Sequence, residues 1–171
     1  MNPRRSPFSI RRSTLAVSLL AALTLFLPFP TAASTPHPPL GEWHTFTAQD
    51  GLAANTITAI AQAPDGSLWV GTPRGVSRYD GQAWETFTEA STDGGLPDDR
   101  VLTLLAGRDG SLWLGTETGG LARYDPAGAH WRTYTRADGL AGDQVLALLE
   151  DDQGRLWVGT DAGLSRFDGQ V

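Results

Sequence analysis

The side chains that could perform chemistry in this sequence do not form a catalytic set. No cysteine is present, which excludes disulfides and thiolate metal sites. The histidines are His37, His44 and His130, and no two of them have the i, i+4 spacing of paired metal ligands. No serine lies in a Gly-x-Ser-x-Gly turn. We therefore predict no catalytic centre, no metal site and no cofactor.

Two groups of charged residues could have either a functional or a structural role. The acidic triplet Glu150-Asp151-Asp152 offers the oxygen ligands that Ca²⁺ prefers, but it occurs once and Gly154 follows it as in a tight turn. Arg78, Arg123 and Arg166 recur at matching positions and could clamp a substrate. We favour a solvated turn for the acids and a row of salt bridges for the arginines.

The elements that position these side chains follow a repeat of 44 residues. Its first landmark is a Gly-Leu pair at 51–52, 95–96 and 139–140, and its second is a Leu-Trp-x-Gly-Thr block at 68–72, 112–116 and 156–160. Another aromatic landmark, Trp43, Trp84 and Trp131, is spaced 41 and 47 residues apart. The difference between these two spacings indicates loops of different length, whereas the constant spacing of the Leu-Trp-x-Gly-Thr blocks indicates a rigid framework.

Each unit divides into four short extended segments. The first is apolar on both faces, as in a strand between two layers, and covers 57–63, 101–106 and 145–149. The second contains the tryptophan block. The third alternates in polarity up to Asp80, Asp125 or Asp168, where an Asx-turn fits. The fourth, at 84–88 and 131–135, is rich in Thr and aromatic residues.

Four strands in about 44 residues with an aromatic landmark are typical of a propeller blade. We therefore predict an all-β fold: a partial β-propeller of three four-stranded antiparallel blades in an open arc, preceded by a helical signal segment. The blades are expected at about 51–88, 95–135 and 139–171. Stacked β-solenoids and a three-hairpin sheet are the alternatives.

The units resemble the two-component regulator propeller repeat. That pattern has Gly-Leu, an apolar strand, Asp-x-x-Gly, Leu-Trp-hydrophobic-Gly-Thr and Gly-Leu-x-Arg-Tyr/Phe-Asp, and the third unit follows it from Gly139-Leu140 through 150–160 to 163–168. The resemblance covers about 43–171. Pro64 and Arg108 stand in the first two units where the family prefers an acid.

Such repeats are similar to the periplasmic input regions of bacterial hybrid sensor proteins. The resemblance implies a propeller that binds an external ligand, a small molecule or a glycan, and serves signalling across the membrane. No kinase, cyclase or DNA-binding segment is found in the sequence. We expect a ligand-binding or sensing segment that is not an enzyme. The alternatives are a structural repeat for protein association and a fragment of a propeller lyase or glycosidase.

The tryptophan blocks are expected to be structural. A Trp within an apolar strand is more often packing between blades than a platform for sugars, the Gly of the block suits close approach of a neighbouring sheet, and the Thr suits a bond to backbone at the strand end. The residues are Trp69, Trp113, Trp157, Gly71, Gly115, Gly159, Thr72, Thr116 and Thr160.

Binding residues are expected on one face of the propeller. If the first strand of each blade is innermost, the connections from fourth to first strand and from second to third strand emerge on the same side. These loops vary between units while the strands do not, as binding loops on a rigid scaffold do. The polar residues predicted to contact a ligand there are Asn55, Arg74, Arg100, Glu117, Gln144 and Asp161.

The N-terminal segment has the three parts of a signal peptide. Arg4, Arg5, Arg11 and Arg12 form a basic region, 15–27 is almost wholly apolar, and Thr31-Ala32-Ala33 supplies small residues at the cleavage positions. We predict a signal peptide at 1–33, a Pro-rich linker at 34–42 and a periplasmic or secreted product. An uncleaved leader is the alternative, and it would be the only link to a membrane.

The charge of the remaining chain limits its partners. All nineteen acidic residues lie at or after Glu42, whereas four of the thirteen basic residues lie in the leader. So acidic a body repels phosphate backbones and anionic lipid, which argues against nucleic acid as a partner.

Three blades are fewer than the four to eight of closed propellers. We therefore expect an incomplete propeller whose two outer faces expose apolar residues, among them Ile57, Leu68, Leu146 and Leu164. The chain is then either a gene fragment, continued by further blades, or part of an assembly in which several copies complete a ring.

The leader gives a direct prediction. Cleavage after Ala33 will yield a product that begins at Ser34 and fractionates with periplasm or medium. N-terminal sequencing or mass spectrometry of the exported protein checks this, and an intact Met1 in the membrane fraction would establish the uncleaved anchor instead.

Overall fold

The structure, a computed structural model, describes residues 41–169. The predicted signal peptide and nearly all of the predicted linker lie outside this range. Within it, the chain consists of eleven strands and two single-turn 3₁₀ helices, η1 (Ala48–Asp50) and η2 (Arg136–Asp138). No helix among these residues is long and apolar enough to cross a bilayer.

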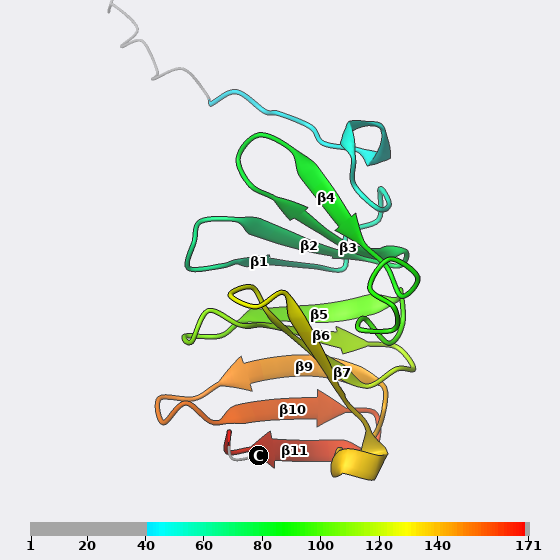
Figure 1. The fold of residues 1–171 in the computed structure, drawn as a ribbon, viewed down its shortest axis with the longest axis vertical. Helices are drawn as coiled ribbons and strands as arrows, with labels where there is room; N and C mark the ends of the chain where they lie inside the picture. The colour runs from blue at the N-terminus through cyan, green and yellow to red at the C-terminus, as the bar shows by residue number, and fades with distance from the viewer. Residues whose placement is uncertain (1–40, 170–171) are drawn as a thin grey trace, which may run out of the picture. The chain divides into compact units, whose positions relative to one another are not determined.

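The strands form three antiparallel sheets, each following the chain order (Figure 1). Blade 1 contains β1 (Ala59–Gln62), β2 (Leu68–Thr72), β3 (Gly75–Tyr79) and β4 (Trp84–Phe87). Blade 2 contains β5 (Val101–Ala106), β6 (Leu112–Thr116), β7 (Leu121–Asp125) and β8 (His130–Tyr134). Blade 3 contains β9 (Val145–Glu150), β10 (Leu156–Thr160) and β11 (Gly163–Phe167).

The predicted fold class, a partial propeller of antiparallel blades, is confirmed, with one difference in blade 3. Its sheet has three strands among the described residues. The stretch Asp168-Gly169-Gln170-Val171 corresponds to Asp80-Gly81-Gln82-Ala83, after which β4 begins. The position of a fourth strand therefore lies beyond the described part of this sequence.

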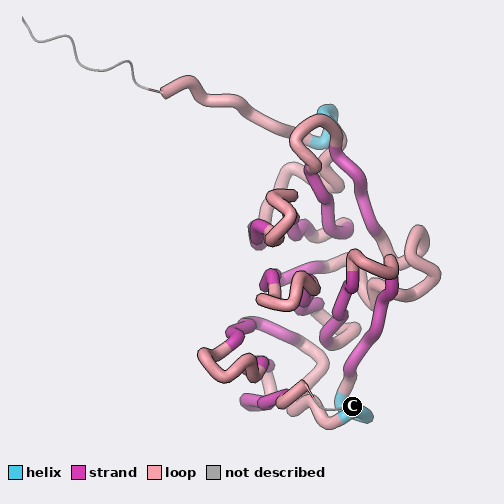
Figure 2. Tube along the Cα trace, turned by 60° about the vertical axis from the view of Figure 1, so that its left-hand side comes forward, coloured by secondary structure: helices cyan, strands magenta, loops and turns pink. Residues whose placement is uncertain are grey.

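The sheets stack face to face, with blade 2 in the middle (Figures 1 and 2). Their first strands, β1, β5 and β9, are neighbours, and contacts between blades concentrate there. Two apolar clusters fill the two spaces between blades. The first joins Trp69 and Val76 of blade 1 to Val101 and Leu114 of blade 2. The second joins Trp113 of blade 2 to the corresponding face of blade 3.

The glycine of the tryptophan block lets the next blade approach closely. A Cβ at Gly71 would lie 2.9 Å from Cγ1 of Val101, and a Cβ at Gly115 would lie 2.5 Å from Cγ1 of Val145. Both valines are fully buried. Each interface is therefore a β-branched side chain of one blade seated on a bare backbone position of the preceding blade.

The threonine that follows closes the turn between the second and third strands. Thr72 Oγ1 donates to the Gly75 carbonyl and Thr116 Oγ1 to the Gly120 carbonyl, both at 2.8 Å, and Thr160 Oγ1 donates to Gly163 at 2.9 Å. Gly75 and Gly120 have positive φ, 119° and 86°. Their N–H groups reach the next blade, where they donate to the carbonyls of Asp99 (2.7 Å) and Asp143 (3.0 Å).

A serine on the third strand of blades 1 and 3 accepts a hydrogen bond from the loop that enters the same blade. The Ala53 N–H donates to Ser77 Oγ and the Ala141 N–H to Ser165 Oγ, both at 2.9 Å. In blade 2 the corresponding residues are Pro97, which has no N–H, and Ala122, which has no hydroxyl. Donor and acceptor are therefore absent together, and no polar group is left unpaired at that position.

The two outer faces of the stack are open, as expected from three blades. Val76, Leu121 and Leu164 are equivalent in the three blades, and their exposed fractions are 0%, 2% and 66%. At the other end Ile57 is 40% exposed while its counterparts Val101 and Val145 are fully buried. Leu146 is exposed as predicted. Leu68 is half-buried and differs from the prediction.

The half-buried state of Leu68 has a physical reason in the segment that precedes blade 1. Residues 43–47 correspond to β4 and β8 in the repeat, and Phe46 lies over blade 1. Its ring is 5.7 Å from that of Tyr79 and 5.6 Å from that of Trp84. Phe87 contacts Tyr124 and Trp131 of blade 2 in the same way. The chain thus partly covers the same face of blade 1 to which Leu68 belongs.

The glycines give a prediction with a matched control in the same motif. Gly115→Ala will overpack the interface of blades 2 and 3 and lower the free energy of unfolding by about 1–3 kcal/mol. Gly159→Ala will change it by less than about 0.5 kcal/mol, because the nearest atom to a Cβ there, Ala147 Cβ, is 3.4 Å away. Urea unfolding at high dilution measures both, and equal losses would show that the glycines do not serve blade packing.

Candidate binding face

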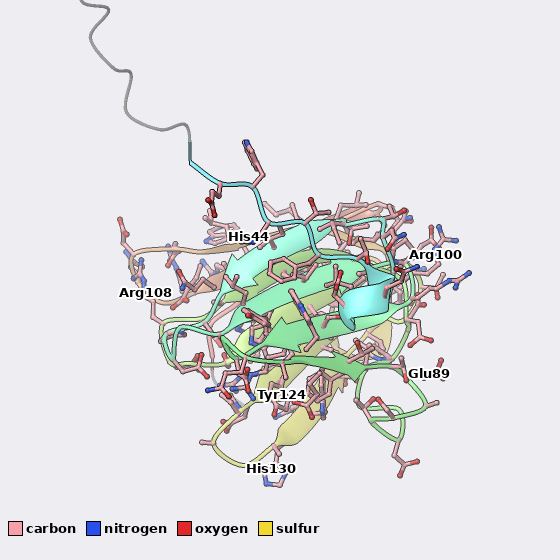
Figure 3. All side chains as sticks on the ribbon, turned by 90° about the horizontal axis from the view of Figure 1, so that it is seen from above. His44, Glu89, Arg100, Arg108, Tyr124 and His130 are labelled. Carbon is pink, nitrogen blue, oxygen red and sulfur yellow. The ribbon has the colours of Figure 1, made fainter. Side chains whose placement is uncertain are left out.

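The loops of the three blades are sorted onto two sides of the stack. The connections from fourth to first strand and from second to third strand lie on one side, here called the loop face, and the tight turns at 63–67, 107–111 and 151–155 lie on the other (Figure 1). Glu89 and Arg100 project on the loop-face side and Arg108 on the opposite side (Figure 3). The sequence prediction of which loops share a face is therefore confirmed.

Each loop that enters a first strand is fixed by one carboxylate or amide oxygen. Asn55 Oδ1 accepts from the Ala48 N–H, Asp99 Oδ1 from the Glu89 N–H and Asp143 Oδ1 from the Arg136 N–H, each at 2.7 Å. In blades 1 and 3 a capping threonine adds a 3₁₀ turn, η1 or η2, that ends in a glycine of positive φ. Asn55, predicted as a ligand contact, is thus occupied in holding its own loop.

An open hollow on the loop face contains three of the six predicted residues. Glu117 comes from the β6–β7 turn, Gln144 from the entry to β9 and Asp161 from the β10–β11 turn. The hollow holds about 340 Å³, and its other lining residues are Thr118, Arg136, Gly142, Asp143 and Ala162. Blades 2 and 3 both contribute to it.

Backbone hydrogen bonds fix the loop positions from which these side chains extend. The Glu117 N–H donates to the Arg100 carbonyl at 3.0 Å, and the Asp161 N–H donates to the Gln144 carbonyl at 3.1 Å. The Arg100 guanidinium lies 2.7 Å from the Glu117 carboxylate. Within the described chain, the side chains of Gln144 and Asp161 have no polar partner, so their oxygen and nitrogen atoms are available to a ligand. Arg74 lies on the blade 1 turn, outside the hollow.

Asp98 anchors the rim of the hollow. Its carboxylate accepts from the Arg100 N–H at 3.0 Å and, at 2.8 Å, from both the N–H and the hydroxyl of Thr118. Partial burial raises the pKa of Asp98, but these hydrogen bonds and the charge of Arg100 outweigh it, so the pKa lies below its ordinary value of 3.8. The loops of blade 2 are thus tied together by an ionised group.

Sequence reasoning missed Thr118, Arg136 and Asp143. The repeat register could have revealed Asp143, because it aligns with Asn55 and Asp99 immediately before the first strand. No signal in the sequence distinguishes Arg136 or Thr118 from other loop residues. Across residues 41–169, no three His, Asp or Glu side chains converge as they would around a metal ion.

The opposite side carries a repeated arrangement of Asp, Arg and Trp. Arg78 pairs with Asp65 (3.0 Å) and lies over Trp69, and Arg123 pairs with Asp109 (2.6 Å) and lies over Trp113. Two members of the predicted row of salt bridges, Arg78 and Arg123, therefore form separate pairs, each within its own blade.

Blade 3 also has an Asp–Arg pair beside its tryptophan, but the pair is made by different residues. Asp151 accepts from the indole N–H of Trp157 at 2.8 Å and pairs with Arg155 at 2.7 Å. The indole bond above all, with the Arg155 and Gln153 bonds, places the pKa of Asp151 far below its ordinary range. Both Arg155 and Arg166 lie over the Trp157 ring. The acidic triplet thus orders a turn and orients a tryptophan.

A family of known proteins has the same repeat. The model of the two component regulator propeller matches at residues 51–74, 95–118 and 139–162, which contain the loop entry, the first two strands and the following turn of each blade. The chain carries three regulator propeller repeats. No curated protein matches the sequence significantly.

Solved structures with similar folds include extracellular domains and a surface protein. The extracellular domain of a putative hybrid two component system from B. thetaiotaomicron is 25% identical with a TM-score of 0.62, over 73% of this chain and 17% of that one. A second such domain from that organism is 24% identical, with a TM-score of 0.57 and coverage of 67% and 16%. PorZ, a surface component of the type-IX secretion system of Porphyromonas gingivalis, is 21% identical, with a TM-score of 0.52 over 67% of this chain and 17% of PorZ. This chain thus spans about a sixth of the length of these solved structures.

The low pKa of Asp98 gives a pH prediction. Because its folded-state pKa lies below 3.8, the bonds to Thr118 are intact above that pH and are lost as the pH falls below it. The amide resonance of Thr118, followed by NMR, will therefore titrate with a midpoint below 3.8, and Asp98→Asn will remove this titration. Asp93→Asn, in the same loop, is the control and will leave it unchanged. A midpoint above 3.8 would contradict the assignment.

Proposed function

We propose that this chain is an extracytoplasmic ligand-binding segment of a sensor propeller, and that the hollow between the loops of blades 2 and 3 is its binding site. One observation carries the proposal: Gln144 and Asp161 are held by backbone bonds at adjacent loop ends, yet their side chains have no partner within the described chain. A ligand can therefore bind these side chains without first breaking a hydrogen bond within the protein.

The chemistry of the hollow favours a polyhydroxylated ligand. Its lining offers carboxylate, amide and hydroxyl groups and one guanidinium, and it has no aromatic or large apolar side chain. Alternating donors and acceptors of this kind match the hydroxyl groups of a neutral saccharide. Three carboxylates, Glu117, Asp143 and Asp161, disfavour an anionic ligand.

The location and the sensing role are supported by the comparisons. Similar folds occur in extracellular domains of hybrid two component systems. The proposed role in this chain is to bind a soluble glycan fragment outside the cytoplasm and to serve a signalling partner, without turning the ligand over. Product analysis by mass spectrometry after incubation with the bound saccharide tests the last point, and any consumption of the saccharide would contradict it.

Calorimetric titration with a panel of neutral oligosaccharides tests the site. At least one will bind, and Gln144→Ala and Asp161→Ala will each weaken it about tenfold, as expected for one lost hydrogen bond of about 1.4 kcal/mol. Arg108→Ala and Asp152→Ala, on the opposite side, are the matched controls and will leave the affinity unchanged. Binding that survives both loop-face substitutions would place the site elsewhere, and no binding by any saccharide would favour a role in protein association.

A further inference from the structure

The hollow has a counterpart in blade 2, where the same two backbone positions carry an ion pair. The first position, just before β5 or β9, is Arg100 in blade 2 and Gln144 in blade 3. The second position, just after β6 or β10, is Glu117 in blade 2 and Asp161 in blade 3. In both blades the N–H of the second position donates to the carbonyl of the first, at 3.0 and 3.1 Å. The side chains of the two blades therefore extend from equivalent places.

The side chains at these positions are paired in blade 2 and unpaired in blade 3. Nε of Arg100 lies 2.7 Å from a carboxylate oxygen of Glu117. In blade 3 an aspartate keeps the carboxylate, but Gln144 supplies no positive charge in place of the arginine. Across residues 41–169, no arginine forms an ion pair with Asp161. Blade 3 thus keeps the acid of the pair and lacks its cation.

Gly142 makes room for the Asp161 carboxylate at the wall of the hollow. It aligns with Asp98, whose carboxylate binds the N–H groups of Arg100 and Thr118 in blade 2. A Cβ at residue 142 would overlap with Oδ1 of Asp161. An alanine there would therefore displace the carboxylate from its place beside the hollow, which holds about 340 Å³.

The charges around the hollow leave Asp161 uncompensated. The lining has three carboxylates and one guanidinium. Glu117 is neutralised by Arg100. Asp143 accepts a hydrogen bond from the Arg136 N–H at 2.7 Å. A carboxylate in a region of surplus negative charge attracts a cation, and a charge-assisted hydrogen bond is about twice as strong as a neutral one. A ligand with a positive charge is therefore favoured at Asp161.

We infer that the hollow contains a position for a cationic nitrogen beside Asp161, and that the saccharide of the proposed function is an amino sugar. The protonated amine of the ligand takes at Asp161 the role that the Arg100 guanidinium has at Glu117. An ammonium group offers three donors, so the amide oxygen of Gln144 can accept a second bond. The inference rests on the proposed function for the contacts to the hydroxyl groups, but the cation position can be tested without any saccharide.

Methylguanidinium, the head group of arginine, tests the cation position by NMR titration. At millimolar concentrations it will shift the amide resonances of Gln144 and Asp161. Asp161→Asn will abolish the shift. Asp152→Asn, on the opposite side of blade 3, removes the same charge and will keep it. The absence of a shift, or a shift that survives Asp161→Asn, would overturn the inference whatever the saccharides do.

A graft of the blade 2 pair into blade 3 tests the equivalence of the two blades. The double variant Gln144→Arg with Asp161→Glu will fold, because blade 2 carries this pair on the same backbone arrangement. Its own guanidinium will occupy the cation position, so methylguanidinium will no longer shift the resonances of residues 144 and 161. The net charge changes by the same amount as in Asp161→Asn. A double variant that still binds methylguanidinium at these residues would contradict the equivalence.

Paired saccharides test the ligand class. Each neutral oligosaccharide that binds is compared by calorimetry with its 2-amino-2-deoxy analogue and the N-acetylated form of that analogue. At a pH that protonates the amine, the amino sugar will bind about fivefold tighter than both neutral forms, as an exposed ion pair allows. Added salt will weaken only the amino sugar, and Asp161→Asn will remove its advantage.

The outcomes separate this inference from the proposed function. Equal affinities of the amino and neutral forms in every pair would overturn the amino sugar and leave the saccharide site intact. An advantage that survives Asp161→Asn would also overturn it. If no saccharide of either kind binds, both the proposed function and the amino sugar fail, even where methylguanidinium binds beside Asp161.

Discussion

The fold depends on one contact, the seat of a β-branched side chain of one blade on the bare glycine backbone of the preceding blade. At Gly71 and Gly115 the distance to the next blade leaves no room for a methyl group. Around each contact, a tryptophan on the second strand and an aliphatic residue on the third strand are buried by the same neighbour. A blade alone cannot bury this face, because its four short strands have no residues to spare for covering it. Stability therefore belongs to the interfaces between blades more than to the blades themselves.

The sequence predicts this framework well because the framework repeats. Three copies of the tryptophan block in constant register identify the strand, turn and packing positions together. A strand or turn that is ambiguous in one unit can be assigned from the other two. The roles of Gly115 and Thr116 could be inferred because each has one physical reason to be where it is. Two features were harder to predict: the three-stranded sheet of blade 3 and the burial of Leu68. Both depend on which residues lie next to the end units, and the repeat carries no information about those neighbours.

The binding face was only partly predictable. The strand order was enough to predict which connections share a side, and three of the predicted residues, Glu117, Gln144 and Asp161, line one hollow there. For Asn55 the sequence alone does not choose between two uses of an amide before a first strand, ligand contact and loop anchoring. The alignment of Asn55 with Asp99 and Asp143 favours anchoring, since the same contact occurs three times at 2.7 Å. Irregular loop residues such as Arg136 have no counterpart of this kind, so their position needs coordinates.

The nearest-neighbour arrangement of the sheets also governs how the chain moves. Within each blade every strand pairs with the one beside it in sequence, so each blade can form from local contacts. The contacts between blades concentrate on β5 with β1 and β2, and on β9 with β5 and β6. Local pairing of this kind is fast, and its order spreads from a nucleus to adjacent units. Blade 2, covered on both sides, is therefore the unit from which opening is rarest. Its amides will exchange with solvent most slowly, and exchange will quicken outward toward either end of a single chain.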